Sequence, residues 1–129
     1  MRALIPMRSL ARYFAGLMAI ALLAAGCAAK NTPSQVTAEQ LQQSFQKADA
    51  PIVEEVAQAS TALQASNYSQ AVIIMNRVAQ TQPLEAAQKA AVDALLIQTR
   101  KAIERDPKLD SPQLYQAMSE LLVRAHGEN

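Results

Sequence analysis

The sequence predicts an all-α protein, a small antiparallel stack of about five helices. Ala, Gln, Leu and Glu, which favour helix, dominate the chain after its leader segment. No glycine lies between Gly26 and Gly127, and tight hairpin turns need positive φ, so strands joined by such turns are disfavoured. Apolar residues also recur at helical spacing between prolines. We therefore expect one helical domain over residues 37–126, followed by a short tail at 127–129.

The first two helices are delimited by capping residues and a proline. Thr37 is suited to cap the first helix, with Gln40 three residues on as its partner in a capping box. Asp49 and Pro51 end this helix and open the second, because proline fits the first turn of a helix but not its interior. The expected second helix covers about Pro51–Ala65.

Three further helices follow from the same signals. Asn67 is suited to cap the third helix, a proline in the first turn is expected to open the fourth, and Gly127 is a natural stop for the fifth. The expected extents are about Tyr68–Gln82, Pro83–Arg105 and Pro112–His126. Three apolar residues fall outside the inward stripes of these helices, namely Ile73, Ile97 and Val123.

The segment Ser66–Pro83 carries a further pattern. A turn of small polar residues precedes the aromatic Tyr68, and Ala71 follows three residues later. This pattern resembles the turn and second helix of a tetratricopeptide repeat, which implies that the second and third helices cross closely at Ala71. No second copy follows in register, so we expect one tetratricopeptide-like helix pair without a peptide groove built from repeats. The alternative is a generic helical hairpin.

The N-terminal segment has the order of an export signal. Three arginines precede an apolar run at 13–25, and small residues lead to Cys27, the single cysteine of the chain. The apolar run is too short for a bilayer span, which needs about 20 residues. The segment resembles a bacterial lipoprotein signal, which implies removal of residues 1–26, lipidation of Cys27 and a flexible tether over 27–36.

Two interpretations of this signal stay open. In the first, Cys27 is acylated and tethers the protein to a membrane. The resemblance then implies the outer membrane of the bacterial envelope, facing the periplasm, because Ala28 stands where an aspartate would suggest retention in the inner membrane. In the second, an ordinary secretory signal is cut near Gly26 or Ala28 and leaves a free thiol.

The charge pattern argues against a nucleic-acid partner. Three of the 12 Lys and Arg residues lie in the leader and none of the 11 Asp and Glu residues does, so the remaining chain has a net charge of about −2. The densest basic group surrounds Arg100-Lys101 and is interrupted by Glu104 and Asp106. We interpret it as a solvated helix end, where cations suit the helix dipole.

The residue types that carry chemistry are sparse. His126 is the only histidine and lies next to the C-terminal Gly127, where we expect a solvated tail residue. With Cys27 acylated, no Cys and His set for a metal exists, and no nucleophile and base pair is evident. The sequence offers no glycine-rich phosphate loop. We therefore predict no enzyme activity, no cofactor, no metal and no small-molecule substrate.

The sequence thus predicts a non-catalytic envelope lipoprotein, a membrane-tethered helical module for interaction or structure. The off-face residues Ile73, Ile97 and Val123 are the candidates for a protein contact. Because the third and fourth helices are adjacent in sequence, we expect Ile73 and Ile97 to share one surface. The partner would be another envelope protein, and the alternative function is an accessory subunit of an outer-membrane assembly or secretion complex.

Overall fold

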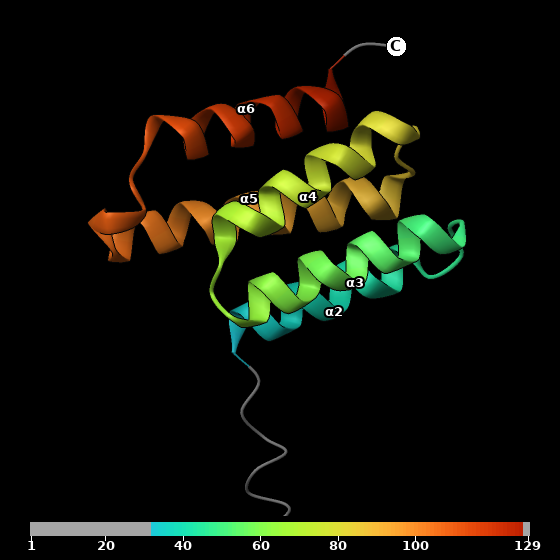
Figure 1. Ribbon diagram of the computed structural model, residues 1–129, viewed down its shortest axis with the longest axis horizontal. Helices are drawn as coiled ribbons and strands as arrows, with labels where there is room; N and C mark the ends of the chain where they lie inside the picture. Colours follow the sequence, from blue (N-terminus) through green and yellow to red (C-terminus); the bar gives the residue numbers. More distant parts are fainter. Residues whose placement is uncertain (1–31, 128–129) are drawn as a thin grey trace, which may run out of the picture. The chain divides into compact units, whose positions relative to one another are not determined.

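The computed structural model of the protein describes residues 32–127. The signal segment and residues 27–31, which are Cys27 and the first half of the predicted tether, therefore lie outside the described residues, as do residues 128 and 129. Within 32–127 the chain forms five α-helices and one short 3-10 helix, so the predicted all-α class is confirmed. With the labels of Figure 1, the elements are α2 (Pro33–Phe45), α3 (Ala50–Gln64), α4 (Tyr68–Thr81), α5 (Ala86–Arg105), η2 (Pro107–Leu109) and α6 (Pro112–His126).

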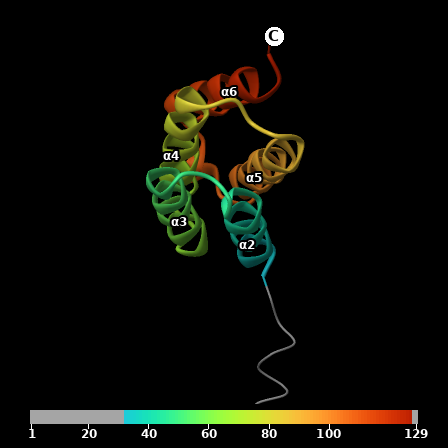
Figure 2. The same ribbon diagram turned by 90° about the vertical axis from the view of Figure 1, so that its right-hand side faces the viewer.

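The helices pack as a closed ring in the order α2, α3, α4, α6, α5. Figure 2, turned by 90° from Figure 1, shows this ring, with α6 lying across the gap between α4 and α5. Consecutive helices run in opposite directions, which makes α4 and α6 parallel neighbours (Figure 1). The order of the ring therefore differs from the order of the sequence, since α4 and α5 make few contacts with each other.

Aliphatic side chains fill the ring. Each helix contributes a stripe at helical spacing, so that five partly apolar surfaces close on one core. The core has a single Phe and one Tyr, and alanines bring the helices close together. Its largest fully buried side chains are Phe45, Leu41, Leu63, Met75, Leu95, Leu121, Val56, Val72, Val78 and Val92.

Polar side chains bond across the packed helices. Burying a polar group costs free energy unless the group is hydrogen-bonded. Each such bond therefore favours one relative position of the two packed helices over others. Three of these bonds end on a backbone carbonyl: Ser60 Oγ to Ala38 at 3.0 Å (α3 to α2), Gln88 Nε2 to Ser44 at 3.3 Å (α5 to α2), and Asn76 Nδ2 to Ala117 at 2.9 Å (α4 to α6).

The predicted start of the first helix is wrong by five residues. The helix begins at Pro33 with Thr32 as its N-cap, and Thr32 and Gln35 form the reciprocal pair of a capping box. Pro33 occupies the first turn, where its missing N–H costs nothing. Thr37 instead lies inside the helix, where its hydroxyl donates to the Pro33 carbonyl at 3.0 Å. Residues 33–36, predicted as tether, therefore belong to the helical domain.

The predicted start of the fourth helix is also wrong. Helix α5 begins at Ala86, three residues after Pro83, and Glu85 is its N-cap. The residue before a proline is driven to extended backbone, and Gln82 has φ −153° and ψ 152°. The backbone N–H of Glu85 donates to Gln88 Oε1 at 2.9 Å, which satisfies the helix entry at this later point. The second, third and fifth helices begin and end within a residue of their expected bounds.

Helices α3 and α4 form the predicted helix pair and pack extensively on each other. Ala71 is fully buried, as a close crossing requires. The turn between them is a Schellman motif, because the Asn67 N–H donates to the Ala62 carbonyl at 2.8 Å and the Ser66 N–H to the Leu63 carbonyl at 3.0 Å. The kinship of this pair with tetratricopeptide repeats stays a prediction.

Ser66 in this turn has φ of +61°, the left-handed conformation that glycine tolerates best. We expect Ser66→Gly to raise the free energy of unfolding by about 1 kcal/mol, because the Cβ strain of the left-handed residue disappears. Thermal denaturation measures this as a rise in Tm of roughly 4–8 °C. The matched control is Ala90→Gly on the exposed face of α5, which should lower the stability by about 1 kcal/mol. A fall in both variants would contradict a left-handed Ser66.

Candidate functional site

An apolar groove of about 480 Å³ runs between α5 and α6. Its central lining is Leu96, Ile97, Tyr115, Met118 and Leu122. Apolar side chains that gather in one groove make it a candidate surface for binding another protein. Asp93, Arg100 and Ser119 complete the lining.

The groove arises from the way the two helices pack elsewhere. Helix α6 buries one stripe (Leu114, Met118, Leu121 and Ala125) and packs mainly on α4. Helix α5 packs mainly on α2 and makes a smaller contact with α6. The facing sides of α5 and α6 therefore diverge, and the apolar residues next to their buried stripes stay open to solvent. Ile97 is 56% exposed, and Tyr115 and Leu122 are each 48% exposed.

Charged groups border this apolar strip on α5. Asp93 Oδ1 lies 2.6 Å from Nε2 of His126, the last residue of α6, so a hydrogen bond joins the two side chains. His126 is thus not simply solvated, as the sequence suggested, because it connects the end of α6 to α5. Arg100 lies two helical turns after Asp93, also on the groove lining. The groove therefore has an acidic residue and a basic residue on one helix face.

The three sequence-predicted contact residues are all exposed, as predicted: Ile73 by 44%, Ile97 by 56% and Val123 by 60%. Only Ile97 lines the α5–α6 groove. Val123 borders a separate shallow hollow on α6, which meets the groove at Ser119. Ile73 belongs to neither hollow, so the expectation that it shares a surface with Ile97 is not supported. The reason is topological, because α6 packs between α4 and α5.

Tyr115 and Leu122 are the contact candidates that sequence reasoning missed. A signal for Leu122 was present in the run Leu121-Leu122-Val123, because a helix can turn only one of three consecutive residues fully inward. Whether the Tyr115 side chain faces another helix or solvent depends on which helices α6 packs against. Only the ring arrangement shows that both residues face α5.

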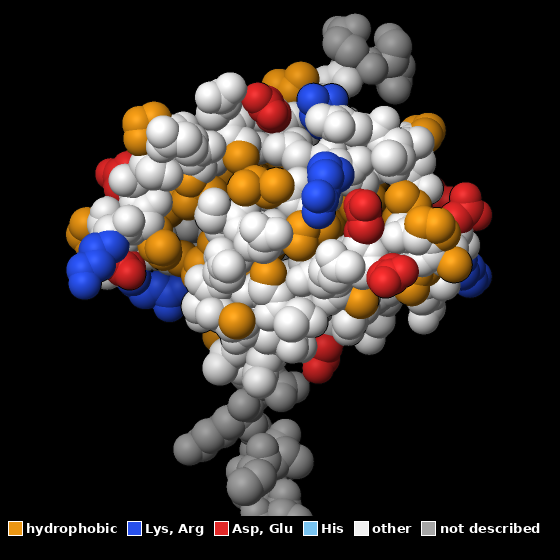
Figure 3. All heavy atoms as spheres, viewed as in Figure 1, with side chains coloured by type: hydrophobic (Ala, Val, Ile, Leu, Met, Phe, Trp, Pro, Cys, Tyr) orange, Lys and Arg blue, Asp and Glu red, His pale blue; other side chains and the backbone are white. Residues whose placement is uncertain are grey.

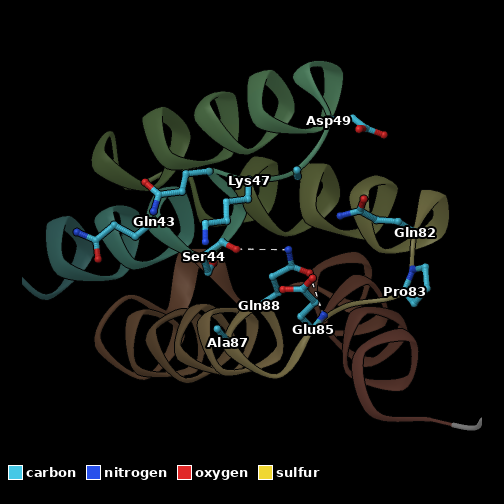
Figure 4. Close-up of a pocket in the computed structure, with 11 residues that line it drawn as sticks. Gln43, Ser44, Lys47, Asp49, Gln82, Pro83, Glu85, Ala87 and Gln88 are labelled. Carbon is cyan, nitrogen blue, oxygen red and sulfur yellow. Dashed lines mark hydrogen bonds between the residues drawn. The ribbon is translucent and has the colours of Figure 1, made fainter.

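A second, polar cleft of about 360 Å³ lies where α2 ends and α5 begins (Figure 4). Figure 4 shows Lys47, Asp49 and Glu85 among amide side chains around it. Gln88 spans the cleft floor, with its amide bonded to the Ser44 carbonyl and to the Glu85 N–H. These bonds hold the helix ends together, and no nucleophile and base pair is built here. We interpret this cleft as a structural joint.

The remaining surface offers little chemistry. The face in Figure 3 carries Lys and Arg interspersed with Asp and Glu, with hydrophobic side chains scattered between them, and it has no broad basic patch. Residues 32–127 contain no group of three or more His, Cys, Asp or Glu residues that could hold a metal. In the same range, no helix combines the length and hydrophobicity needed to cross a membrane. Comparisons with protein-family models, curated proteins and solved structures found no significant match. The α5–α6 groove is therefore the best candidate site.

Proposed function

We propose that the protein is a non-catalytic lipoprotein of the bacterial cell envelope, anchored by an acylated Cys27, whose helical domain binds protein through the α5–α6 groove. The observation that carries the binding role is the row of half-exposed apolar side chains at Ile97, Tyr115 and Leu122. Exposed residues of this size cost solubility unless a partner covers them. Aromatic and large aliphatic side chains are also the types that anchor protein interfaces.

The anchor in this proposal rests on the sequence. Cys27 follows a short apolar segment and small residues, which suits lipid transfer to the thiol and cleavage before it. Helix α2 begins at Pro33, so only about five residues separate the cysteine from the folded domain. A tether of this length holds the domain within about 17 Å of the lipidated residue. The domain would therefore work close to the membrane surface, on the periplasmic side of the outer membrane.

We expect Cys27→Ser to move the protein from the membrane fraction to precursor or soluble fractions. Each acyl chain contributes about 0.8 kcal/mol per buried methylene, and two or more chains together anchor stably. Fractionation with immunoblotting measures the distribution, and mass spectrometry of the mature N-terminus detects the lipid. The control is Ala29→Ser, which makes a similar change two residues away and should leave the protein in membranes. Membrane association that persists in Cys27→Ser, or a free thiol on mature protein, would refute the anchor.

A further inference from the structure

We propose that the occupant of the α5–α6 groove is a second copy of this chain, in a two-fold symmetric dimer centred between Leu96 and Ile97. This inference rests on the proposed role of the groove in protein binding and names the partner. A two-fold interface is self-complementary, so each residue on one side of the axis must suit the residue that symmetry places opposite. The charge pattern of α5 meets this condition.

Asp93 and Arg100 are the first self-complementary pair. They lie seven residues apart, nearly two full turns, and therefore on the same helix face, about 10 Å from each other. Both line the groove, and they are equidistant from the point between Leu96 and Ile97. When two α5 helices pack antiparallel about that point, Asp93 of each protomer faces Arg100 of the partner subunit. A carboxylate accepts several hydrogen bonds, so Asp93 can keep its contact with His126 and still bind an arginine.

Lys89 and Glu104 extend the same pattern along α5. They are also equidistant from the point between Leu96 and Ile97, and they lie within about 30° of the Asp93–Arg100 face at 100° per residue. From the N-terminal to the C-terminal end of this stripe, the charges of the four side chains are positive, negative, positive and negative. The reversed copy presents negative, positive, negative, positive, so opposite charges meet at all four positions.

The centre of the stripe is apolar. Leu96 and Ile97 lie closest to the axis, and Tyr115 and Leu122 of α6 form the other wall of the groove. Homodimer interfaces are typically more apolar at the centre than the rest of the surface and carry their charges at the rim. The α5–α6 face has this distribution, with apolar residues at the middle and charges toward both ends of the stripe.

The dimer is compatible with two lipid anchors in one membrane. The two-fold axis lies within the interface and perpendicular to both α5 helices, so the two copies of Thr32 are at equal height along it. With the axis along the membrane normal, the two copies of Thr32 are therefore at the same distance from the bilayer, and both tethers approach it from one side. The symmetry therefore does not conflict with the proposed anchor.

Cysteine crosslinking of the full chain tests the dimer. Ile97→Cys places a thiol near the axis. A disulfide needs a Cα–Cα distance of roughly 4.4–6.8 Å, which two residues close to a two-fold axis can reach. Treatment of cell extracts with an added oxidant should give a covalent dimer on non-reducing gels. Ile73→Cys is the matched control, because Ile73 is similarly exposed but lies on α4 outside the groove. The unmodified chain reports any dimer formed through Cys27.

Charge reversal then tests the pairing, with Ile97→Cys as reporter. Asp93→Arg alone and Arg100→Asp alone should each lower the dimer yield by roughly tenfold, because like charges meet twice. Co-expression of the two variants with different tags should restore a mixed dimer, because each protomer then complements the other. His126→Ala controls for the contact that Asp93→Arg removes. A variant that merely fails to fold would not be rescued by the other.

The possible outcomes distinguish a failure of the proposed dimer from a failure of the proposed lipid anchor. The added oxidant makes crosslinking independent of the compartment, so a failed anchor in Cys27→Ser fractionation leaves the dimer test valid. Equal crosslinking at Ile73→Cys and Ile97→Cys would overturn the dimer, as would a mixed pair no better than the single variants. If Ile97→Cys gives no covalent dimer while the anchor is intact, the proposal that a second copy occupies the groove is refuted. The groove would then bind a different protein.

Discussion

Phe45→Ala should lower the free energy of unfolding by about 3–5 kcal/mol, the range for large aromatic truncations in packed cores. Phe45 ends α2, is only 1% exposed, and is the sole phenylalanine of the described residues. The core is otherwise almost entirely aliphatic, with Tyr68 as its one other aromatic residue, so smaller side chains would have to fill the space that Phe45 leaves. Since a domain of this size is stable by only about 5–15 kcal/mol, the variant should be close to unfolding at 37 °C.

Thermal and urea denaturation followed by circular dichroism measure this effect. The matched control is Val36→Ala on the same helix, where the side chain is 52% exposed and the expected change stays within about 0.5 kcal/mol. Equal small losses in both variants would show that Phe45 is not the core residue that the ring arrangement makes it.

Asn76→Asp should destabilise the protein by roughly 3–5 kcal/mol at pH 7, because it leaves an uncompensated charge in the α4–α6 interface. Asn76 is 7% exposed, and its Nδ2 donates to the Ala117 carbonyl at 2.9 Å. A carboxylate has no proton to donate and would face that carbonyl oxygen. Asn76 Oδ1 is already buried without a partner, so the site offers no donor that could stabilise the negative charge.

The loss of stability in Asn76→Asp should increase with pH. Burial without a cationic partner raises the pKa of the introduced carboxyl in the folded state above its unfolded value of about 3.9. Below that unfolded value the group is protonated in both states, and its O–H can replace the lost donor, so the penalty is small. The penalty grows as the pH rises above about 4 and levels off once the folded-state carboxyl ionises.

Denaturation at several pH values, with the wild type measured in parallel, tests this dependence. Asn76→Leu removes the donor without adding a titratable group, so its destabilisation should be nearly independent of pH. Identical pH profiles for the two variants would show that the side chain at position 76 reaches solvent.

Local signals along the chain were sufficient for most of the helix boundaries. Asn67 caps α4 through its side chain, as the sequence indicates, because a cap depends only on residues within one turn. Ser111 caps α6 in the same way. The errors at α2 and α5 are of the same local kind. Thr32 with Gln35, and Glu85 with Gln88, provided alternative starts that competed with Thr37 and Pro83.

The contact residues were predictable only in part. The helical period placed Ile73, Ile97 and Val123 off the inward stripes, and all three are exposed. The period of a helix defines which residues share a face but not which neighbour that face meets. Consequently, the grouping of Ile97 with Tyr115 and Leu122, rather than with Ile73, could not be derived from one sequence.

The sequence alone determined the helical class, the number of helices and the inward stripes, because glycine absence, capping residues and apolar period act within a few residues. The tertiary structure alone decided the order of the ring. Helix α6 packs parallel to α4 and separates it from α5, which brings residues distant in sequence together, such as Asn76 and Ala117. These choices depend on how five stripes best bury their apolar surface at once, a property of the whole chain. The α5–α6 groove is an apolar surface that this packing leaves uncovered.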